Sequence, residues 1–598
     1  MASTREGYSP IGYNITKREQ LELLRQQLIN ERSSFMTHWR ELGDYVLPRR
    51  PRFTLSDTNK GEKRSQKIID STATLAMRTL RSGMMSGITS PARPWFRLTT
   101  PDPELAEFGP VKEWLHFVGN RMATIFLRSN VYNVLPTIYG DIGTFATGCM
   151  FMEEDFDEVV RFYPFPVGSY MIANDEMLRV RVFMREFRMT VRQLISKFGK
   201  QRDGTIDWSK FSTQVRSLWD QAHYEAWIDV IHVVQPNEMY EPSQIQSKYK
   251  KFYSCYYERG YSGTAGSSYY NSEDERRFLS EGGFDNFPIL APRWETTGED
   301  TYGTDCPGMS ALGDIKALQT MHKRKAQAID KMVNPPMVGP TNLKTTKTSI
   351  LPGDLTYTDE RDGTKGFRPA HLVDPRILEV RQDIIEHQDR IRRACYEDLF
   401  LMLANTDRRQ ITAREIDERH EEKLLALGPV LEQLNQDLLD PLIDNTFAIM
   451  LKQGLIPPPP EELDGVELKV EYISVMAQAQ KLVGLGGLER FTGFVGQLIS
   501  VTQDPSHMDK VNVDQLIDEY GEGAGLPPKV IRTDEEVAEI KQSRAQAQEQ
   551  QAQAERASQV VPAMAGAAKQ LSETQTQGGS ALDQLLAQAE AGGLTETV

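Results

Sequence analysis

Hydrophobic positions between residues 310 and 453 recur at helical spacing in three long stretches. In residues 310–333 the apolar repeat consists of Leu312, Ile315, Leu318, Ile329 and Met332. Such spacing brings apolar side chains to one face of a helix. Two prolines at 335 and 336 end the pattern, because proline lacks a backbone donor and disfavours helix in the residue before it. A helix of roughly two dozen residues is about 36 Å long, which suits the lining of a channel.

A second helix is predicted for residues 374–404. Asp374 is a candidate N-cap, and Pro375 fits the first helical position. Its apolar stripe consists of Ile377, Val380, Ile384, Ile391, Cys395 and Leu399. With residues 310–333 it would form a helical hairpin, whose sides need neighbours if they are to be buried.

A third helix is predicted to begin at residues 412–415, whose sequence TARE fits a capping box. Leucines then recur every three or four residues on one face: Leu424, Leu427, Leu431, Leu434, Leu438 and Leu442. Pro429 and Pro441 fall inside this pattern, so the helix is predicted to kink.

The rest of the chain mixes helical and strand patterns. Helices are predicted for residues 16–47, 68–89, 110–130, 470–500 and 511–520, and strands for residues 179–187 and 227–234. Residues 260–286, rich in Gly, Ser and Tyr, are expected to form an exposed loop. After residue 541 Gln and Ala dominate, which predicts disorder or a helix that depends on neighbouring copies.

Composition and charge argue against several classes of function. The chain has 598 residues, enough for several structural units, and its net charge of −15 is not that of a general nucleic-acid binder. No apolar run of about eighteen residues predicts a membrane helix, and residues 1–10 lack the apolar core of a signal peptide. The scattered cysteines fit reduced thiols better than disulfides or zinc ligands: Cys149, Cys255, Cys306 and Cys395.

Motifs for catalysis are missing from the sequence. There is no GxxxxGK[ST] phosphate loop, and no HExxH, GxSxG or EF-hand pattern. We therefore expect no catalytic residues, no metal site and no cofactor, and a DNA-processing enzyme is improbable.

Several short strings, in this order along the chain, resemble the portal (head-to-tail connecting) proteins of short-tailed double-stranded DNA bacteriophages. They are PARPWFRL at 91–98, YGTDCPG at 302–308, ALGDIK at 311–316, KMVNPP at 331–336, ITAREI at 411–416 and LGPV at 427–430. The resemblance extends from about residue 15 to about residue 540.

The resemblance implies a helix-dominated α+β portal fold assembled as a ring around a central channel. The implied parts are an N-terminal wing (1–309), a first stem helix (310–333), a clip (334–373), a second stem helix (374–404), a channel loop (405–411), a long kinked wing helix (412–460), a crown (461–540) and a tail (541–598).

It also implies a function and partners. A homo-oligomeric ring of about twelve copies would occupy one capsid vertex, let terminase package the genome and later let the genome leave, and hold tail adaptor and head-completion proteins. The major capsid protein, scaffold and duplex DNA would be further partners, without a membrane. The protein would be found in the host cytoplasm during assembly and then at the head-tail junction of the virion. The alternative is another virion structural protein, such as a scaffold or tail component, although a scaffold would more often be a simple helical rod.

Basic residues at three places are candidates for contact with DNA. By position, the family's channel loop corresponds to Asn405, Thr406, Asp407, Arg408, Arg409 and Gln410; a plain connection whose arginines pair with carboxylates is an equal alternative. The stem candidates are Lys323, Arg324, Lys325, Arg390, Arg392 and Arg393, in the lumen or paired with Asp383, Glu386 or Asp389. The third place is a basic run, either a DNA or partner contact or a solvated loop: Arg49, Arg50, Arg52, Lys60, Lys63, Arg64 and Lys67.

Physical reasons limit how many of these charges line a channel. Successive helical residues turn by about 100°, so adjacent cations cannot all point the same way. A protein that grips about six to ten phosphates binds DNA tightly, which would oppose sliding. We therefore expect a mainly acidic or neutral lumen with isolated basic rings.

The clip is expected to contain short strands that pair with the next subunit, because such strands are marginal alone. The candidate docking residues are Ser349, Leu351, Leu355 and Tyr357. This end would meet the packaging motor first and the tail adaptors later.

Overall fold

The structure is a computed structural model. It describes residues 17–56, 61–102, 105–106, 108–200, 203–259, 278–339, 341–344, 368–369, 377–406, 427–463, 465–466, 468–474, 491–495, 497–498, 511–513, 515–516, 537, 540–547, 575–576 and 579–580. The chain divides into two compact units, Met1–Phe494 and Val495–Val598. No helix in these ranges is long and apolar enough to cross a membrane.

A five-stranded antiparallel sheet forms one part of the first unit. Its strand order is β4 (Tyr170–Asn174), β5 (Val180–Thr190), β6 (Trp227–Pro236), β7 (Phe252–Glu258) and β8 (Ser280–Phe284). Side chains alternate between the two faces, so each strand contributes to two apolar layers. The strands expected at 179–187 and 227–234 correspond to β5 and β6.

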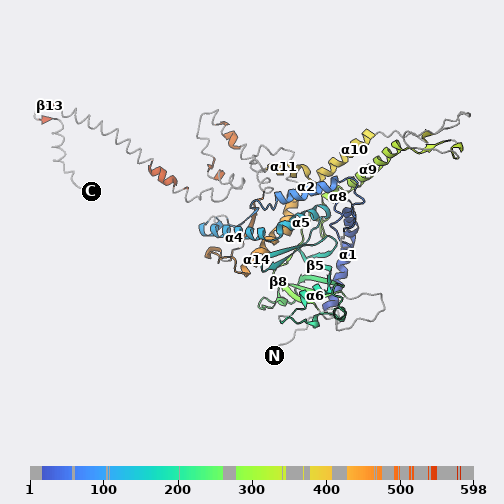
Figure 1. Cartoon of the computed structure of the whole chain (residues 1–598). Coiled ribbons are helices and arrows are strands. Elements are labelled where there is room, and N and C mark those ends of the chain that lie inside the picture. Colours follow the sequence, from blue (N-terminus) through green and yellow to red (C-terminus); the bar gives the residue numbers. More distant parts are fainter. Residues whose placement is uncertain are drawn as a thin grey trace. The chain divides into compact units, whose positions relative to one another are not determined.

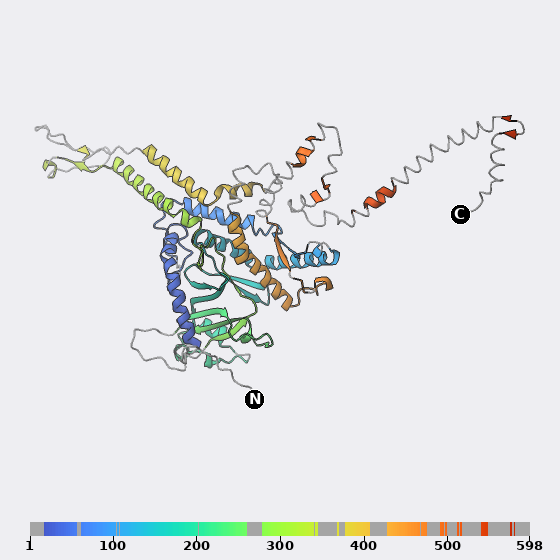
Figure 2. The same ribbon diagram turned by 180° about the vertical axis from the view of Figure 1, so that it is seen from behind.

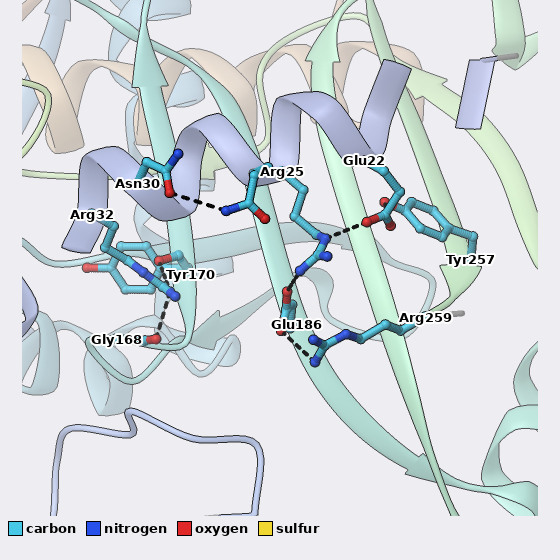
Figure 3. A network of polar contacts seen from close by, with 10 residues as sticks. Glu22, Arg25, Asn30, Arg32, Gly168, Tyr170, Glu186, Tyr257 and Arg259 are labelled. Atoms are coloured by element: carbon cyan, nitrogen blue, oxygen red, sulfur yellow. Dashed lines mark hydrogen bonds and ion pairs between the residues drawn. The ribbon is translucent and has the colours of Figure 1, made fainter. Parts of the chain in front are cut away.

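Helix α1 (Lys17–Tyr45) lies across one face of this sheet (Figure 3). Leu21 and Leu28 pack there against Met184, Val233 and Tyr257. Polar contacts fix the same helix. Arg25 reaches Glu22 and, on β5, Glu186, each at 2.7 Å.

The other face of the sheet meets a second apolar cluster that contains Trp39, Phe183 and Tyr302. This cluster connects the sheet to a three-stranded sheet of order β3 (Val159–Pro164), β2 (Met150–Asp155) and β9 (Ile289–Leu290). Two short helices, α6 (Val191–Phe198) and α7 (Thr213–Asp220), pack in a separate cluster beside β6.

Three helices form the largest core with the stem: α2 (Thr72–Gly87), α4 (Gly109–Arg128) and α5 (Val131–Phe145). Helices α2 and α5 approach closely because Gly143 has no side chain. A Cβ atom there would lie 2.8 Å from Cδ2 of Leu80. This close contact fixes α2 on α5, so α2 can support the helices that pack against its other side.

The stem is a helical hairpin that projects from this body (Figures 1 and 2). Its first helix is α9 (Leu312–Val333), preceded by the single turn α8 (Pro307–Ser310), and its second is α10 (Ile377–Ala394). Beyond α9, β10 (Met337–Val338) pairs with β11 (Arg368–Pro369). Residues Thr341–Lys344 form the 3-10 turn η4. The candidate docking residues Ser349, Leu351, Leu355 and Tyr357 lie outside the described residues.

The second stem helix is not continuous, contrary to the single helix expected at 374–404. Helix α10 ends at Ala394 and α11 spans Glu397–Thr406. Between them Tyr396 has a φ of 54°, a left-handed backbone that an α-helix cannot contain. The break lets α11 change direction and lie on α2.

The long wing helix is described from Leu427 onward. Helix α13 (Gly428–Leu434) continues through one π-helical segment, η5 (Asn435–Leu439), into α14 (Asp440–Lys452). The irregularity immediately precedes Pro441, where a kink was predicted. The capping box expected at 412–415 lies outside the described ranges.

Two expected boundaries differ from the structure. Strand β12 (Lys469–Tyr472) pairs with β1 (Phe96–Thr99), so these residues of the expected crown form a sheet with the N-terminal region. The loop expected at 260–286 includes the edge strand β8 at its end. Gly283 permits this strand, because a side chain there would collide with the carbonyl oxygen of Phe252 at 2.6 Å.

The second unit is described only in short pieces. Residues 540–547 are helical, and β13 (Gln575–Thr576) pairs with β14 (Gly579–Ser580).

Candidate functional site: the stem and its junction with the wing

A buried glutamine fastens the stem to the wing. Gln319 of α9 is 5% exposed. Its Oε1 accepts hydrogen bonds from the backbone N–H groups of Ile69 (2.7 Å) and Asp70 (2.8 Å), and its Nε2 donates to the carbonyl of Asp70 at 2.9 Å. This single side chain thus satisfies three backbone groups at the start of α2.

Asp70 extends the junction to both stem helices. Its carboxylate accepts hydrogen bonds from the backbone N–H of Thr72 (2.9 Å) and from Nε2 of Gln388 on α10 (2.9 Å). Nε2 of His322 on α9 lies 3.2 Å away. Burial opposes ionisation of Asp70, but the bonds from Thr72 and Gln388 outweigh it and lower the pKa of this carboxyl.

The two stem helices also contact each other through Asp314 on α9. Nδ1 of His387 on α10 lies 2.8 Å from its carboxylate, and a guanidinium nitrogen of Arg390 lies 3.8 Å away. Lys316 of α9 reaches Glu41 of α1 at 2.6 Å. The base of the hairpin is therefore held both by these polar contacts and by the buried apolar residues Ile315, Leu318 and Ile391.

The predicted stem charges fall into two groups. Arg390 approaches Asp314, and Arg392 approaches Asp389 (3.3 Å) and Glu397 (3.6 Å). Exposed or half-exposed side chains with no ion pair among the described residues form the other group: Lys323, Arg324, Lys325 and Arg393.

The predicted basic run is not one surface. Arg50 forms a bidentate pair with Asp141, whose side chain is 1% exposed, and also donates to the carbonyl of Phe165. Lys67 pairs with Asp44 at 2.6 Å. The interpretation as a DNA contact is therefore wrong for Arg50, because the Asp141 carboxylate and the Phe165 carbonyl already accept its hydrogen bonds. Lys67 keeps a half-exposed side chain beside Asp44, and its role stays a prediction. Lys60 lies outside the described residues.

Helix α11 leads from the stem toward the expected channel loop. Phe400 is 2% exposed and packs against Gly83 of α2 so closely that a methyl group at Gly83 would overlap its ring. Asn405 and Thr406, predicted to be in the loop, are the last residues of α11. Asp407, Arg408, Arg409 and Gln410 lie outside the described residues, and their role stays a prediction.

A buried ion pair holds the irregular segment of the long wing helix. Arg293 is 3% exposed and contacts the Asp437 carboxylate through Nε (2.9 Å) and Nη2 (3.0 Å). Its Nη2 also donates to the carbonyl of Leu178. Sequence reasoning missed this pair, since 144 residues separate the partners; the only local signal was an acidic residue inside an apolar helical pattern.

The four cysteines are buried and unpaired. Burial raises the pKa of Cys255, Cys306 and Cys395 to about 12, so these thiols stay protonated near neutral pH. Over the described part of the chain no group of three or more His, Cys, Asp or Glu side chains is placed to hold a metal ion.

Comparison with known proteins identifies the class. The family described as bacteriophage head to tail connecting protein matches residues 18–531, most of the chain. The protein therefore belongs to this family.

Its relatives agree on a function. The portal protein of Salmonella phage epsilon15 is 47% identical over 567 residues, which cover 95% of this chain and 97% of the relative. The probable portal protein of Bordetella phage BPP-1 is 43% identical over 528 residues, 88% of this chain and 91% of the relative. The phage portal function and the helix-dominated α+β portal fold expected from the sequence are confirmed.

Proposed function

We propose that copies of this chain assemble into a closed ring whose stem hairpins surround a channel for duplex DNA. The observation that carries this proposal is the projecting hairpin of α9 and α10, in a chain that belongs to the head-tail connecting family. Among the described residues no element beyond β10 and β11 lies beside the outer half of this pair of helices, which leaves much of its surface uncovered. Copies arranged head to tail around a rotation axis would cover that surface and close the ring.

In this ring the wing faces the capsid, and the clip beyond β10 and β11 meets the terminase during packaging and tail adaptors afterwards. Terminase supplies the energy, and the ring supplies passage and attachment. Capsid protein and scaffold are the further partners during assembly in the host cytoplasm. The head-tail junction of the virion is the final location.

The ring is tested by light scattering and electron microscopy of the purified chain. The expected result is a particle whose mass is about twelve times 67.9 kDa and whose channel is wide enough for duplex DNA. A closed particle without a channel, or an elongated rod, would favour a tail component or a scaffold instead.

We further propose that Arg408 and Arg409 contact DNA in the channel. Support comes from their position directly after α11, a helix that Phe400 fixes on α2. Replacing both arginines with alanine should change packaging yield or genome retention while leaving the ring intact. Unchanged yield and retention would remove this role.

A further inference from the structure

Arg185 of β5 is a cation for which the described part of the wing provides no anion. Its neighbour Glu186 points to the face of the five-stranded sheet that α1 covers, where it pairs with Arg25 (Figure 3). Side chains alternate along a strand, so Arg185 points to the opposite face. No hydrogen bond or ion pair joins Arg185 to any residue that the structure describes, and its Nε is buried without a partner. A buried polar group without a partner is rare in native proteins and needs a physical reason.

Two phenyl rings pack against the guanidinium of Arg185. Its central carbon lies 4.2 Å from the centre of the Phe165 ring and 4.1 Å from the centre of the Phe187 ring, and the faces of such rings attract a cation. Burial lowers the pKa of Arg185 to about 10, so the side chain stays positively charged near neutral pH. Unlike Nε, the two terminal nitrogens Nη1 and Nη2 are not buried. The rings therefore hold the guanidinium in place while its terminal edge stays open to a ligand.

A second cation faces the same part of the sheet. Arg185, His232 and Tyr256 lie directly opposite one another on β5, β6 and β7, so their side chains form one row on one face. Lys197 of α6 lies over this row, with its Nζ 5.3 Å from the centre of the Tyr256 ring. Burial lowers the pKa of His232, and Arg185 and Lys197 lower it further. Both positive charges therefore lie near the same imidazole.

The acid on this side of the sheet does not neutralise the two cations. Glu153 of β2 acts on Tyr256, and it accepts a hydrogen bond from the hydroxyl of Tyr163. Neither Arg185 nor Lys197 forms an ion pair with Glu153 or with any other described carboxylate. Charges that are removed from water are normally compensated by a partner of opposite sign. The row thus combines two positive charges with no ion-pair partner among the described residues.

We infer that Arg185 and Lys197 bind a small free oxyanion of the phosphate class on this face of the wing sheet. The terminal nitrogens of a guanidinium match a pair of phosphate oxygens, and a lysine adds a compact point charge. A group with more than one negative charge suits two unpaired cations better than a single carboxylate does. Because the phenyl rings already order the guanidinium, binding costs little conformational freedom. The site belongs to the wing of each copy and does not depend on the proposed ring.

Equilibrium dialysis of the purified full chain with radiolabelled inorganic phosphate, near neutral pH and at constant ionic strength, tests the site. We expect each chain to bind a phosphate ion. Arg185→Met and Lys197→Met should each weaken binding at least about tenfold, because each removes a charge-assisted hydrogen bond. Lys197 is exposed, so its variant should fold even if Arg185→Met does not.

The matched control is Arg188→Met on the same strand. Arg188 lies on the opposite face and pairs with Asp229, so the control should bind phosphate as the parent does. Phosphate should also raise the midpoint of thermal unfolding of the parent and of the control but not that of Arg185→Met, since a ligand stabilises only a folded state that binds it. Sulfate should displace the labelled phosphate, whereas chloride at equal ionic strength should not. Circular dichroism confirms that each variant is folded.

Several results would overturn the inference. One is equal phosphate binding by the parent and by the two folded variants, which would place the ion elsewhere on the chain. Another is a parent chain that binds no phosphate at millimolar concentration. Displacement by chloride as efficient as displacement by sulfate would reduce the effect to general charge screening. A short DNA duplex that displaces phosphate from the parent, and whose binding is lost in both variants, would assign the site to a nucleic-acid backbone and contradict the free ion.

Discussion

The wing and the stem hairpin are built on different principles. In the wing, large side chains such as Trp39, Tyr139 and Tyr302 are fully buried, and ion pairs such as Arg293–Asp437 are almost fully enclosed. In the outer hairpin, Val333 and Leu378 are about four-fifths exposed, at 80% and 79%, and long charged side chains surround them. Apolar burial stabilises a fold by roughly 25 cal/mol per Å², so the wing can maintain its own structure, whereas the hairpin would gain most from contact with other copies in the proposed ring.

The junction between the wing and the stem differs from both regions, because polar side chains form it. Gln319 and Gln388 join the stem to the Asp70 segment through directional hydrogen bonds, and Nε2 of His322 lies 3.2 Å from the Asp70 carboxylate. Such contacts fix the angle of the stem more than they add to stability. The net contribution of one hydrogen bond to the free energy of unfolding is only about 0.5–1.5 kcal/mol. The wing is therefore expected to tolerate loss of a junction contact better than loss of a core contact.

The largest loss in the free energy of unfolding is expected from Arg293→Ala in the wing. Removal of one partner leaves Asp437 buried without its cation, which typically costs about 3–5 kcal/mol. Chemical denaturation of the purified chain measures the change in the free energy of unfolding. Arg188→Ala is the control, because its pair with Asp229 is about one-third exposed (36% and 30%) and should cost about 1 kcal/mol or less. Equal losses for the two variants would contradict the contrast between buried and exposed pairs.

A smaller effect is expected from Gly83→Ala, at the contact that holds α11 on α2. The added methyl group overlaps the Phe400 ring, and overpacking of this kind costs about 1–3 kcal/mol. Combining it with Phe400→Leu should cost less than the sum of the two single changes, since neighbouring substitutions couple.

The control for Gly83 is Gly119→Ala in α4. Nothing lies within 4 Å of a Cβ atom at this position, so alanine should be neutral or stabilise by up to about 1 kcal/mol. If the two glycine variants were equally stable, the close approach of α11 to α2 would be disproved.

Asp70→Asn should lower the free energy of unfolding by a smaller amount, and this loss should depend on pH. The folded pKa of Asp70 lies below its ordinary value of 3.8, so the ionised carboxylate stabilises the fold above about pH 4, and this contribution disappears as the pH falls through the lowered pKa. The variant should therefore be less stable than the parent at pH 7, and the difference should narrow toward about pH 3. A difference that grows on acidification would show that Asp70 is not stabilised as an anion.

The smallest effect is expected from Leu378→Ala in the unassembled chain. Its side chain is largely exposed, so the free energy of unfolding should change by no more than about 0.5 kcal/mol. Its counterpart on α11, Leu399, is fully buried, and Leu399→Ala should cost about 2–5 kcal/mol. Comparable losses at the two positions would mean that the outer hairpin is already packed within a single copy.

Periodicity located most helices because their signals are local. The repeat from Leu312 to Met332 lies within α9, and the prolines after it mark where the helix ends. The break at Tyr396 was missed, since no proline or glycine marks it and the left-handed backbone is held by packing of α11 on α2. Pairing of β1 with β12 and of Arg50 with Asp141 was also missed, because distant segments meet only once the whole core has formed.

The candidate site was predicted less well than the fold. Arg50 and Lys67 looked like neighbours in a basic run, but each meets a carboxylate that sequence spacing cannot place. The stem cations were found from sequence, but the structure was needed to separate Arg390 and Arg392, which pair with carboxylates, from Lys323 and Arg324, which have no ion pair among the described residues. Position along a helix identifies a charge, while the elements packed beside it decide its role.

Hydrogen exchange of the assembled and unassembled chain tests the contrast between wing and stem most directly. Size-exclusion chromatography of the purified chain separates the assembled form from the unassembled form. Assembly should slow amide exchange in residues 323–333 and 378–389 and leave β5, β6 and β7 unchanged. Equal exchange of the outer hairpin in both forms would contradict the proposal that neighbouring copies complete the stem.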